Sequence, residues 1–196
     1  MSRYSQARFL KSADSPAAFG DDSGAEVAFA GRSNSGKSSA LNAIVRRKDL
    51  ARTSRTPGRT QFVNLFELEP GRRLADLPGY GHARVPAAVR AAWGRLMDAY
   101  FAERGSLAGL FIVVDSRRGF GASDEAMLEY ASARGLPAHV LLSKSDKLGR
   151  NEARQVLQTA RRALGERAGV QLFSAESGEG VDTAQGALDA LLAGKR

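Results

Sequence analysis

Residues 31–38 of this chain read Gly-Arg-Ser-Asn-Ser-Gly-Lys-Ser, which fits the spacing Gly-x4-Gly-Lys-Ser/Thr. An apolar, strand-like run at 26–30 precedes the motif, and a helix-like stretch follows it. In such a unit, backbone N–H groups converge on phosphate oxygens, the lysine reaches the β- and γ-phosphates, and the serine hydroxyl can bind Mg²⁺. The motif predicts a nucleotide-phosphate cradle, and a Gly-rich turn with a capping serine is the alternative interpretation.

The size and composition of the chain limit what surrounds this motif. With 196 residues, of which 43% are hydrophobic and 26% charged, the chain has the composition of a globular protein with one well-formed core. We expect a single domain over residues 24–194, preceded by a loosely tethered extension over 1–23 that has no convincing periodicity. The chain has no cysteine, which excludes disulfides, thiol catalysis and cysteine-based metal sites.

Charge and hydropathy indicate the partner class and location. The 29 Lys and Arg residues outnumber the 21 Asp and Glu residues, and the formal net charge of +8 favours a polyanionic partner beyond a nucleotide. The longest apolar run, 107–114, is far shorter than the ~20 residues of a membrane helix, and the polar start at 1–5 lacks a signal-peptide core. We expect a cytoplasmic monomer with no membrane partner.

Apolar strand-like runs alternate with amphipathic helix-like stretches along the chain. This alternation predicts an α/β fold with a six-stranded, mostly parallel sheet and helices on both faces. A short turn between the second and third strands predicts an antiparallel hairpin, which supplies one antiparallel edge strand. The predicted strands are 26–30, 61–68, 72–76, 108–114, 137–143 and 169–173, and the predicted helices are 37–46, 87–103, 122–134, 150–166 and 181–193.

Two loops are candidates for binding metal and γ-phosphate. Asp76-Leu77-Pro78-Gly79 ends a strand, so Asp76 can hold Mg²⁺ through water while the Gly79 N–H faces the γ-phosphate. A plain loop is the alternative. Residues 53–61 lie between the first helix and the hairpin, where Thr60 can place its hydroxyl on Mg²⁺ and its N–H on the γ-phosphate. A solvated basic loop is the alternative there.

Two other strand ends have the residue types that recognise guanine. Ser143-Lys144-Ser145-Asp146 follows an apolar strand, and the Asp146 carboxylate can accept hydrogen bonds from N1–H and the exocyclic amine of guanine. The aliphatic stem of Lys144 can lie along the base. Ser174 and Ala175, after the last strand, could present a backbone N–H to the guanine O6.

Together these motifs resemble the EngB (YihA/YsxC) family of bacterial ribosome-assembly GTPases, within the TrmE-Era-EngA-EngB-septin-like group. The resemblance runs from about Phe9 to Leu192 and includes Asn34 in the cradle, the segment 53–61, and Asp-Leu-Pro-Gly-Tyr-Gly at 76–81. The chain departs from the family at 143 and 145, where Thr-Lys-Ala-Asp is more frequent, and at His82, where tyrosine is common. The resemblance implies a Ras-like P-loop G domain that binds GTP and Mg²⁺, hydrolyses GTP slowly, and acts in maturation of the large (50S) ribosomal subunit with a link to cell division and septation.

Position 80 lacks the glutamine that orients the attacking water in many GTPases, because Tyr80 stands there. In related GTPases, an asparagine at the position of Asn34 helps hold K⁺ beside the phosphates, so the resemblance implies K⁺ as a further cofactor. An Asx turn is the alternative for Asn34, and packing of the loop is the alternative for Tyr80.

The expected catalytic residues are Lys37, Asn34, Thr60 and Gly79, and the expected metal ligands are Ser38, Thr60 and Asp76 for Mg²⁺ and Asn34 for K⁺. The expected nucleotide contacts are Gly31, Arg32, Ser33, Asn34, Ser35, Gly36, Lys37, Ser38, Ser39, Gly58, Arg59, Thr60, Gln61, Phe62, Asp76, Leu77, Pro78, Gly79, Ser143, Lys144, Ser145, Asp146, Phe173, Ser174 and Ala175.

The segment 46–59 carries six Lys and Arg residues and one acid, which predicts a contact with ribosomal RNA through a loop ordered by GTP. Three function classes remain at this point. A GTP-dependent switch on an assembling large subunit is favoured. A P-loop small-molecule kinase would leave Asp146 unused, and a nucleotide-stabilised scaffold without meaningful turnover is compatible with Tyr80.

Overall fold

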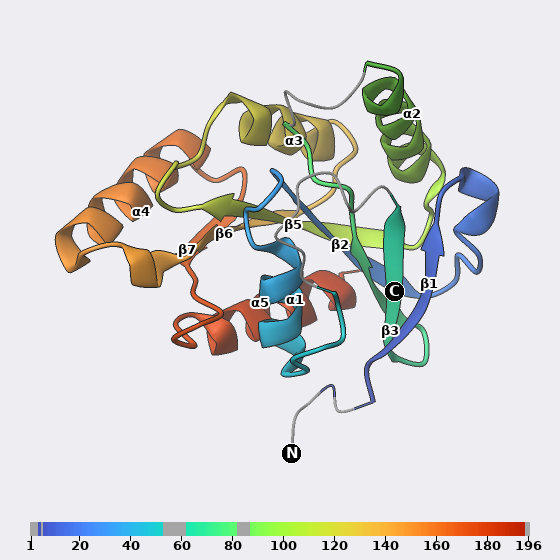
Figure 1. The fold of residues 1–196 in the computed structure, drawn as a ribbon, viewed down its shortest axis with the longest axis horizontal. Helices are drawn as coiled ribbons and strands as arrows, with labels where there is room; N and C mark the ends of the chain where they lie inside the picture. The colour runs from blue at the N-terminus through green and yellow to red at the C-terminus, as the bar shows by residue number, and fades with distance from the viewer. Residues whose placement is uncertain (1–3, 5, 53–61, 82–86, 195–196) are drawn as a thin grey trace.

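The computed structural model describes residues 4, 6–52, 62–81 and 87–194, and its strands form a single sheet (Figure 1). Across this described part the order is β1-β3-β4-β2-β5-β6-β7, and β3 runs against the other six strands. The strands are β1 (Arg8–Ala13), β2 (Ala25–Gly31), β3 (Val63–Glu69), β4 (Arg72–Asp76), β5 (Leu107–Asp115), β6 (Ala138–Ser143) and β7 (Gly169–Leu172).

Helices cover both faces of the sheet. Figure 1 shows α1 and α5 on one face and α2, α3 and α4 on the other. The helices are α1 (Lys37–Val45), α2 (Ala87–Glu103), α3 (Ala122–Ser132), α4 (Arg150–Leu164) and α5 (Val181–Ala193), with 3₁₀ turns η1 (Pro16–Ala18) and η2 (Ser145–Lys147). These bounds confirm the predicted helices to within about two residues of each end.

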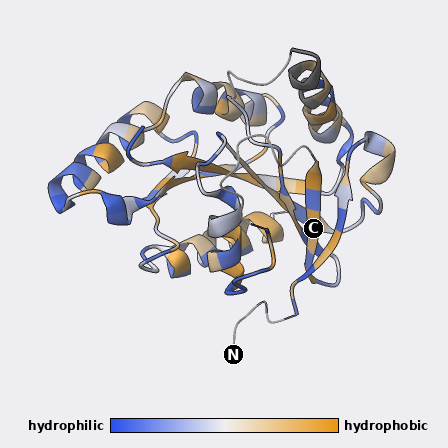
Figure 2. Cartoon of the chain, viewed as in Figure 1, coloured by the Kyte–Doolittle hydropathy of each residue, from blue (hydrophilic) through white to orange (hydrophobic). Residues whose placement is uncertain are grey.

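The central strands are predominantly apolar because both of their faces are buried. Along β2, Val27 and Phe29 pack toward α1 and α5, whereas Ala28 and Ala30 pack in the core on the opposite face. The hydropathy colouring of Figure 2 shows this as orange central strands between helices with mixed orange and blue surfaces. No helix in the described ranges has the length and apolarity required to cross a membrane.

The strand count of six is wrong, because β1 adds a seventh strand at the edge of the sheet. The expected hairpin of β3 and β4 is present, but β3 is covered by β1 and is not itself the edge strand. β1 had no apolar alternation to reveal it, since five of its six residues are exposed. Polar pairs link it to β3 instead: Arg8 Nε donates to Glu67 at 2.7 Å, and Ser12 Oγ donates to Asn64 at 2.7 Å.

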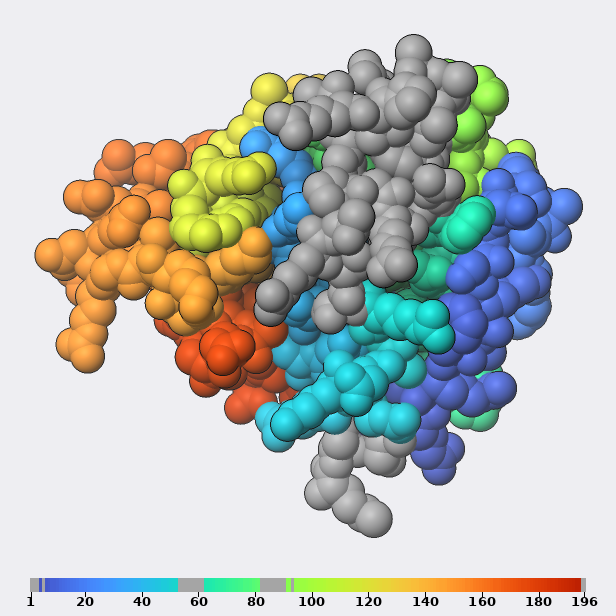
Figure 3. Space-filling view, viewed as in Figure 1, coloured from blue at the N-terminus to red at the C-terminus, as the bar shows by residue number. Residues whose placement is uncertain are grey.

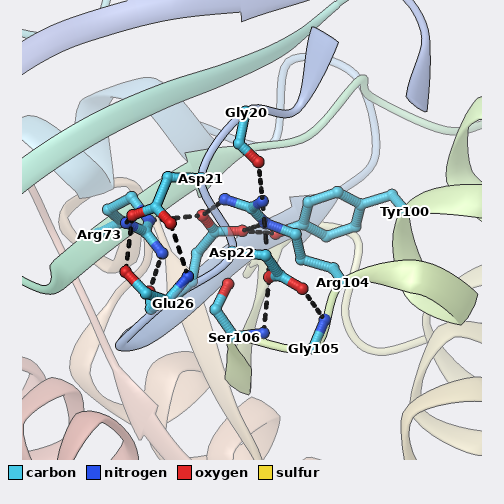
Figure 4. A network of polar contacts seen from close by, with 10 residues as sticks. Gly20, Asp21, Asp22, Glu26, Arg73, Tyr100, Arg104, Gly105 and Ser106 are labelled. Carbon is cyan, nitrogen blue, oxygen red and sulfur yellow. Dashed lines mark hydrogen bonds and ion pairs between the residues drawn. The ribbon is translucent and has the colours of Figure 1, made fainter. Parts of the chain in front are cut away.

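A buried polar network anchors the segment that precedes β2 (Figure 4). Glu26 is fully buried at the start of β2, where it accepts hydrogen bonds from Tyr100 at 2.6 Å and from Arg104 at 2.8 and 3.0 Å. The Asp22 carboxylate accepts the backbone N–H groups of Gly105 and Ser106, each at 2.7 Å. The expectation of a loosely tethered extension is therefore wrong for β1 and for this anchored segment.

Candidate nucleotide site

The phosphate cradle lies between β2 and α1, at the carboxyl end of the sheet. Two of its residues have left-handed backbone, Asn34 with φ 61° and Gly36 with φ 95°, and Gly36 is the N-cap of α1. Glycine and asparagine tolerate this conformation best, which explains their presence here. The turn leads into the positive end of the α1 dipole, where Lys37 occupies the first turn and is 9% exposed. The cradle therefore offers N–H groups and a cation to phosphate.

A hydroxyl and a carboxylate meet beside the cradle in the pattern that Mg²⁺ requires. Ser38 Oγ donates to Asp76 Oδ2 at 2.8 Å, and Asp76 is almost fully buried at the end of β4. Burial raises the pKa of Asp76, an effect that the charge of Lys37 and the hydrogen bond from Ser38 oppose. The other carboxylate oxygen, Oδ1, is buried with no hydrogen-bond partner among the described residues. Oxygen donors of this kind fit Mg²⁺ held partly through water.

The turn after Asp76 is fastened to the cradle by backbone hydrogen bonds. Tyr80 N donates to Gly31 O at 3.3 Å, and Ser33 N donates to Tyr80 O at 3.1 Å. A Cβ on Gly79 would lie 3.0 Å from Ser33 Cα and 3.4 Å from Lys37 Nζ. A side chain at position 79 would therefore press on the cradle, which explains the glycine there.

The loop after β6 closes over the cradle from the other side. Ser143 Oγ donates to Ser35 O at 2.5 Å and to Val114 O at 3.1 Å. Lys144, with φ 59°, extends across the cradle and donates from Nζ to Asn34 O at 2.6 Å and to Asp115 Oδ2 at 2.9 Å. Its aliphatic stem therefore forms a wall beside the cradle, as expected for a side chain that lies along a base.

The Asp146 carboxylate is held in place by the loop after β7. Ser174 Oγ donates to Asp146 Oδ1 at 2.6 Å, and Lys147 Nζ lies 2.9 Å from Oδ2. The Ser174 hydrogen bond, followed by the Lys147 contact, lowers the pKa of Asp146 and keeps it an ionised acceptor. Ser145 N donates to Phe173 O at 3.2 Å, which joins the two loops, and Ala175 is exposed in the second loop.

The structure thus brings together the cradle residues, 76–79, 143–146 and 173–175 as the sequence predicted. Gly58, Arg59, Thr60 and Gln61 lie outside the described residues, and Phe62, which directly precedes β3, is 42% exposed. The left-handed backbone of Asn34 provides a structural reason for an asparagine at that position.

Two acidic residues of the site were missed by sequence reasoning. Asp115, the last residue of β5, accepts hydrogen bonds from Lys144 and from Arg117 at 2.6 Å. Burial alone would raise the pKa of Asp115, but these hydrogen bonds outweigh burial and hold it well below its usual range. An acidic residue at the end of a predicted strand was the one available signal for Asp115.

Asp124, in the first turn of α3, is the second missed acid. It is fully buried and accepts Tyr80 Oη at 2.9 Å, Arg32 Nη2 at 2.7 Å and Gly121 N at 3.0 Å. Burial, followed by the charge and hydrogen bond of Asp124, raises the pKa of Tyr80 well above its usual range, so the phenol stays protonated. This arrangement supports the packing interpretation of Tyr80. Only the capping position of Asp124 near the start of a predicted helix hinted at its role.

Fold and site together define a P-loop GTPase domain. A family described as "50S ribosome-binding GTPase" matches residues 26–144. A protein called "Probable GTP-binding protein EngB" from Xanthomonas campestris pv. campestris (strain 8004) is 51% identical over 185 residues, which cover 92% of this chain and 89% of that one. A protein of the same name from Stenotrophomonas maltophilia (strain K279a) is 50% identical over 187 residues, which cover 93% of this chain and 94% of that one. The chain belongs to the EngB family, and it is a GTPase.

Solved structures agree with this fold. A crystal structure of a probable GTP-binding protein engB superposes with a TM-score of 0.69 at 20% identity, covering 86% of this chain and 99% of that one. Era in complex with MgGDPNP and nucleotides of 16S ribosomal RNA superposes with a TM-score of 0.67 at 18% identity, covering 86% and 57%. At these identities the likeness supports the G-domain architecture alone.

Proposed function

We propose that this EngB-family GTPase is a GTP-dependent switch in assembly of the large ribosomal subunit, docking on the particle in its GTP form and leaving it as GDP. One observation supports the switch in particular. The turn at Gly79 is joined to the cradle by backbone hydrogen bonds and lies beside Lys37, so a γ-phosphate would act directly on the segment that follows. The family description and the rRNA held by Era support a ribosomal partner. Cytoplasmic action as a monomer, and a link to septation, belong to the same proposal.

Each residue has a role in that switch. Lys37 and the cradle N–H groups would neutralise the phosphates, while Ser38 and Asp76, with Thr60 as a proposed third ligand, would hold Mg²⁺. The ion supplies positive charge where negative charge develops during phosphoryl transfer. Asp146, held by Ser174, would accept the two guanine hydrogens that adenine cannot offer. GTPase family membership argues against both the kinase and the inactive scaffold.

The proposal predicts nucleotide-dependent binding to ribosomal particles. Purified protein should cosediment with large-subunit particles more strongly with a non-hydrolysable GTP analogue than with GDP, because only the triphosphate supports the ordered switch segments. Small-subunit particles provide the matched control. Equal sedimentation with both nucleotides, or with both subunits, would overturn the proposed role and leave the GTPase activity as it is.

A second prediction concerns K⁺ and Asn34. If the Asn34 side chain helps hold K⁺ at the phosphates, GTP turnover should be faster in K⁺ than in Na⁺ at equal ionic strength. Asn34→Gly is the sharper variant, because glycine adopts the φ of 61° freely and removes only the side chain. It should abolish the cation preference while GDP affinity stays unchanged. A preference that survives in Asn34→Gly would assign Asn34 to loop geometry alone.

The basic segment 46–59 remains our proposed GTP-dependent RNA contact. In its described part, Arg46 is exposed and pairs with Asp182 on α5 at 2.6 Å. A surface pair of this kind contributes little to stability and can be exchanged for a phosphate contact.

A further inference from the structure

Helix α4 exposes an unusually basic face. Its sequence, from Arg150 to Leu164, contains four arginines, all exposed, and a single acid, Glu152. The buried side of the helix, which packs on the core, includes Ala153, Ala160 and Leu164. Figure 3 shows α4, in orange, projecting at the outer left of the molecule. The helix therefore presents its arginines where a large partner can reach them.

Helical geometry aligns three of these arginines. At about 100° and 1.5 Å per residue, Arg150, Arg154 and Arg161 fall within about 40° of one another around the axis and span about 16 Å along it. Gln158, a further hydrogen-bond donor, lies beside this stripe, about 40° from Arg154 around the axis. Glu152 lies on the far flank, roughly 160° from Arg154. We call Arg150, Arg154 and Arg161 the α4 arginine track.

Several exposed arginines elsewhere in the described chain have an acidic partner, whereas those of the track do not. Arg8 pairs with Glu67, Arg117 with Asp115, and Arg167 with Glu125. No side chain of the track forms an ion pair or hydrogen bond with any residue that the structure describes. A solvated helix of a globular protein normally intersperses both charge signs, so three aligned, unpaired arginines indicate an anionic partner.

We infer that the α4 arginine track binds the phosphate backbone of large-subunit ribosomal RNA, an inference that rests on the proposed function. Guanidinium groups repeated along a line at about 6 and 10 Å suit a row of phosphates, to which arginine donates in bidentate fashion. Other exposed residues of α4, among them Asn151, Gln155 and Gln158, are polar. A membrane surface would require exposed apolar residues to insert beside the charges, and α4 has no exposed large apolar side chain.

The position of the track makes its contribution independent of the bound nucleotide. α4 begins after η2, on the base side of the site, and packs against β7 and the core. It therefore belongs to the fixed frame of the domain rather than to the phosphate-sensing turn at Gly79. The track should strengthen RNA binding equally in the GTP and GDP states, whereas segment 46–59 should supply the difference between them.

The test is the double charge reversal Arg154→Glu/Arg161→Glu. The matched control is Lys11→Glu/Arg95→Glu, which changes the charge equally at two exposed positions on β1 and α2. The double variant Arg154→Lys/Arg161→Lys keeps the charge. Binding is measured over a salt series to large-subunit particles and to deproteinised large-subunit RNA, with a GTP analogue and with GDP. GDP affinity and urea unfolding are followed in parallel to verify that each variant folds.

The α4 reversal should weaken binding to both probes about tenfold or more, by the same factor with either nucleotide, and lower the salt slope by roughly 1.5, as for two lost phosphate contacts. The control variant Lys11→Glu/Arg95→Glu should retain most of its affinity for both probes. Equal losses of affinity in both reversals would show that net charge alone explains the effect. A loss of binding to particles without a loss of binding to naked RNA would show that α4 contacts a ribosomal protein instead of RNA. If the α4 reversal binds both probes as tightly as the unaltered protein, the inference is overturned. If the unaltered protein binds naked RNA through α4 but not particles, the proposed function fails and the track stands.

Discussion

At the scale of single residues, one buried carboxylate joins two separate parts of the site. Asp124 holds the Tyr80 phenol and the Arg32 guanidinium, which come from the turn after β4 and from the cradle. Tyr80 is thereby engaged by a structural partner. It does not replace the missing glutamine in this conformation, so another group has to assist the attacking water.

Asp124→Asn should destabilise the domain by about 3 kcal/mol, because Arg32 loses its buried counter-charge. Tyr80→Phe removes one hydrogen bond and keeps the ion pair, so it should cost about 1 kcal/mol and leave GTP turnover unchanged. Urea unfolding and multiple-turnover phosphate release measure the two effects. A turnover loss in Tyr80→Phe at unchanged stability would show that the hydroxyl participates in hydrolysis.

At the scale of elements, the end of the sheet opposite the nucleotide site is held by charge as well as by apolar packing. Glu26 on β2 and Arg104 after α2 are both almost fully buried and form two hydrogen bonds with each other (Figure 4). Arg73 on β4 lies 3.5 Å from the same carboxylate and also pairs with Asp21. This network fastens the chain before β2 to the junction of α2 and β5.

Arg104→Met should lower the free energy of unfolding by about 3–5 kcal/mol, because Glu26 is left buried with one guanidinium fewer. The double variant Glu26→Met/Arg104→Met should lose less than Arg104→Met alone, since it removes the uncompensated charge. Urea unfolding decides between these outcomes, and GDP affinity serves as the control because the network lies at the amino end of β2. Additive losses would show that the two residues act independently.

At the scale of the whole molecule, parallel strands bring distant loops to one edge. Phe29 is paired with Asp76, Gly31 with Val113, and Asp115 with Ser143, so β2, β4, β5 and β6 all end beside the cradle. A ligand seated there would contact loops that lie more than 100 residues apart in the chain. Part of the excess positive charge lies outside this edge, on α4, which carries four arginines and one acidic residue.

The sequence by itself determined the features that depend on neighbouring residues. The cradle is contiguous in the chain, so its spacing and its strand–loop–helix context were sufficient to predict it. The five helices followed from apolar periodicity, and residues 76–79 and 143–146 were recognisable as polar loops at the ends of apolar strands.

The tertiary structure decided which distant polar groups meet. Nothing near Asp124 in the sequence indicates Tyr80, 44 residues away, or Arg32, 92 residues away, as its partners. The same holds for Lys144 with Asp115 and for Arg104 with Glu26. β1 was missed because an exposed edge strand has no buried face to impose alternation, and only its pairing with β3 makes it a strand. Long-range polar pairing has no periodic signal, because its geometry exists only once the chain has folded.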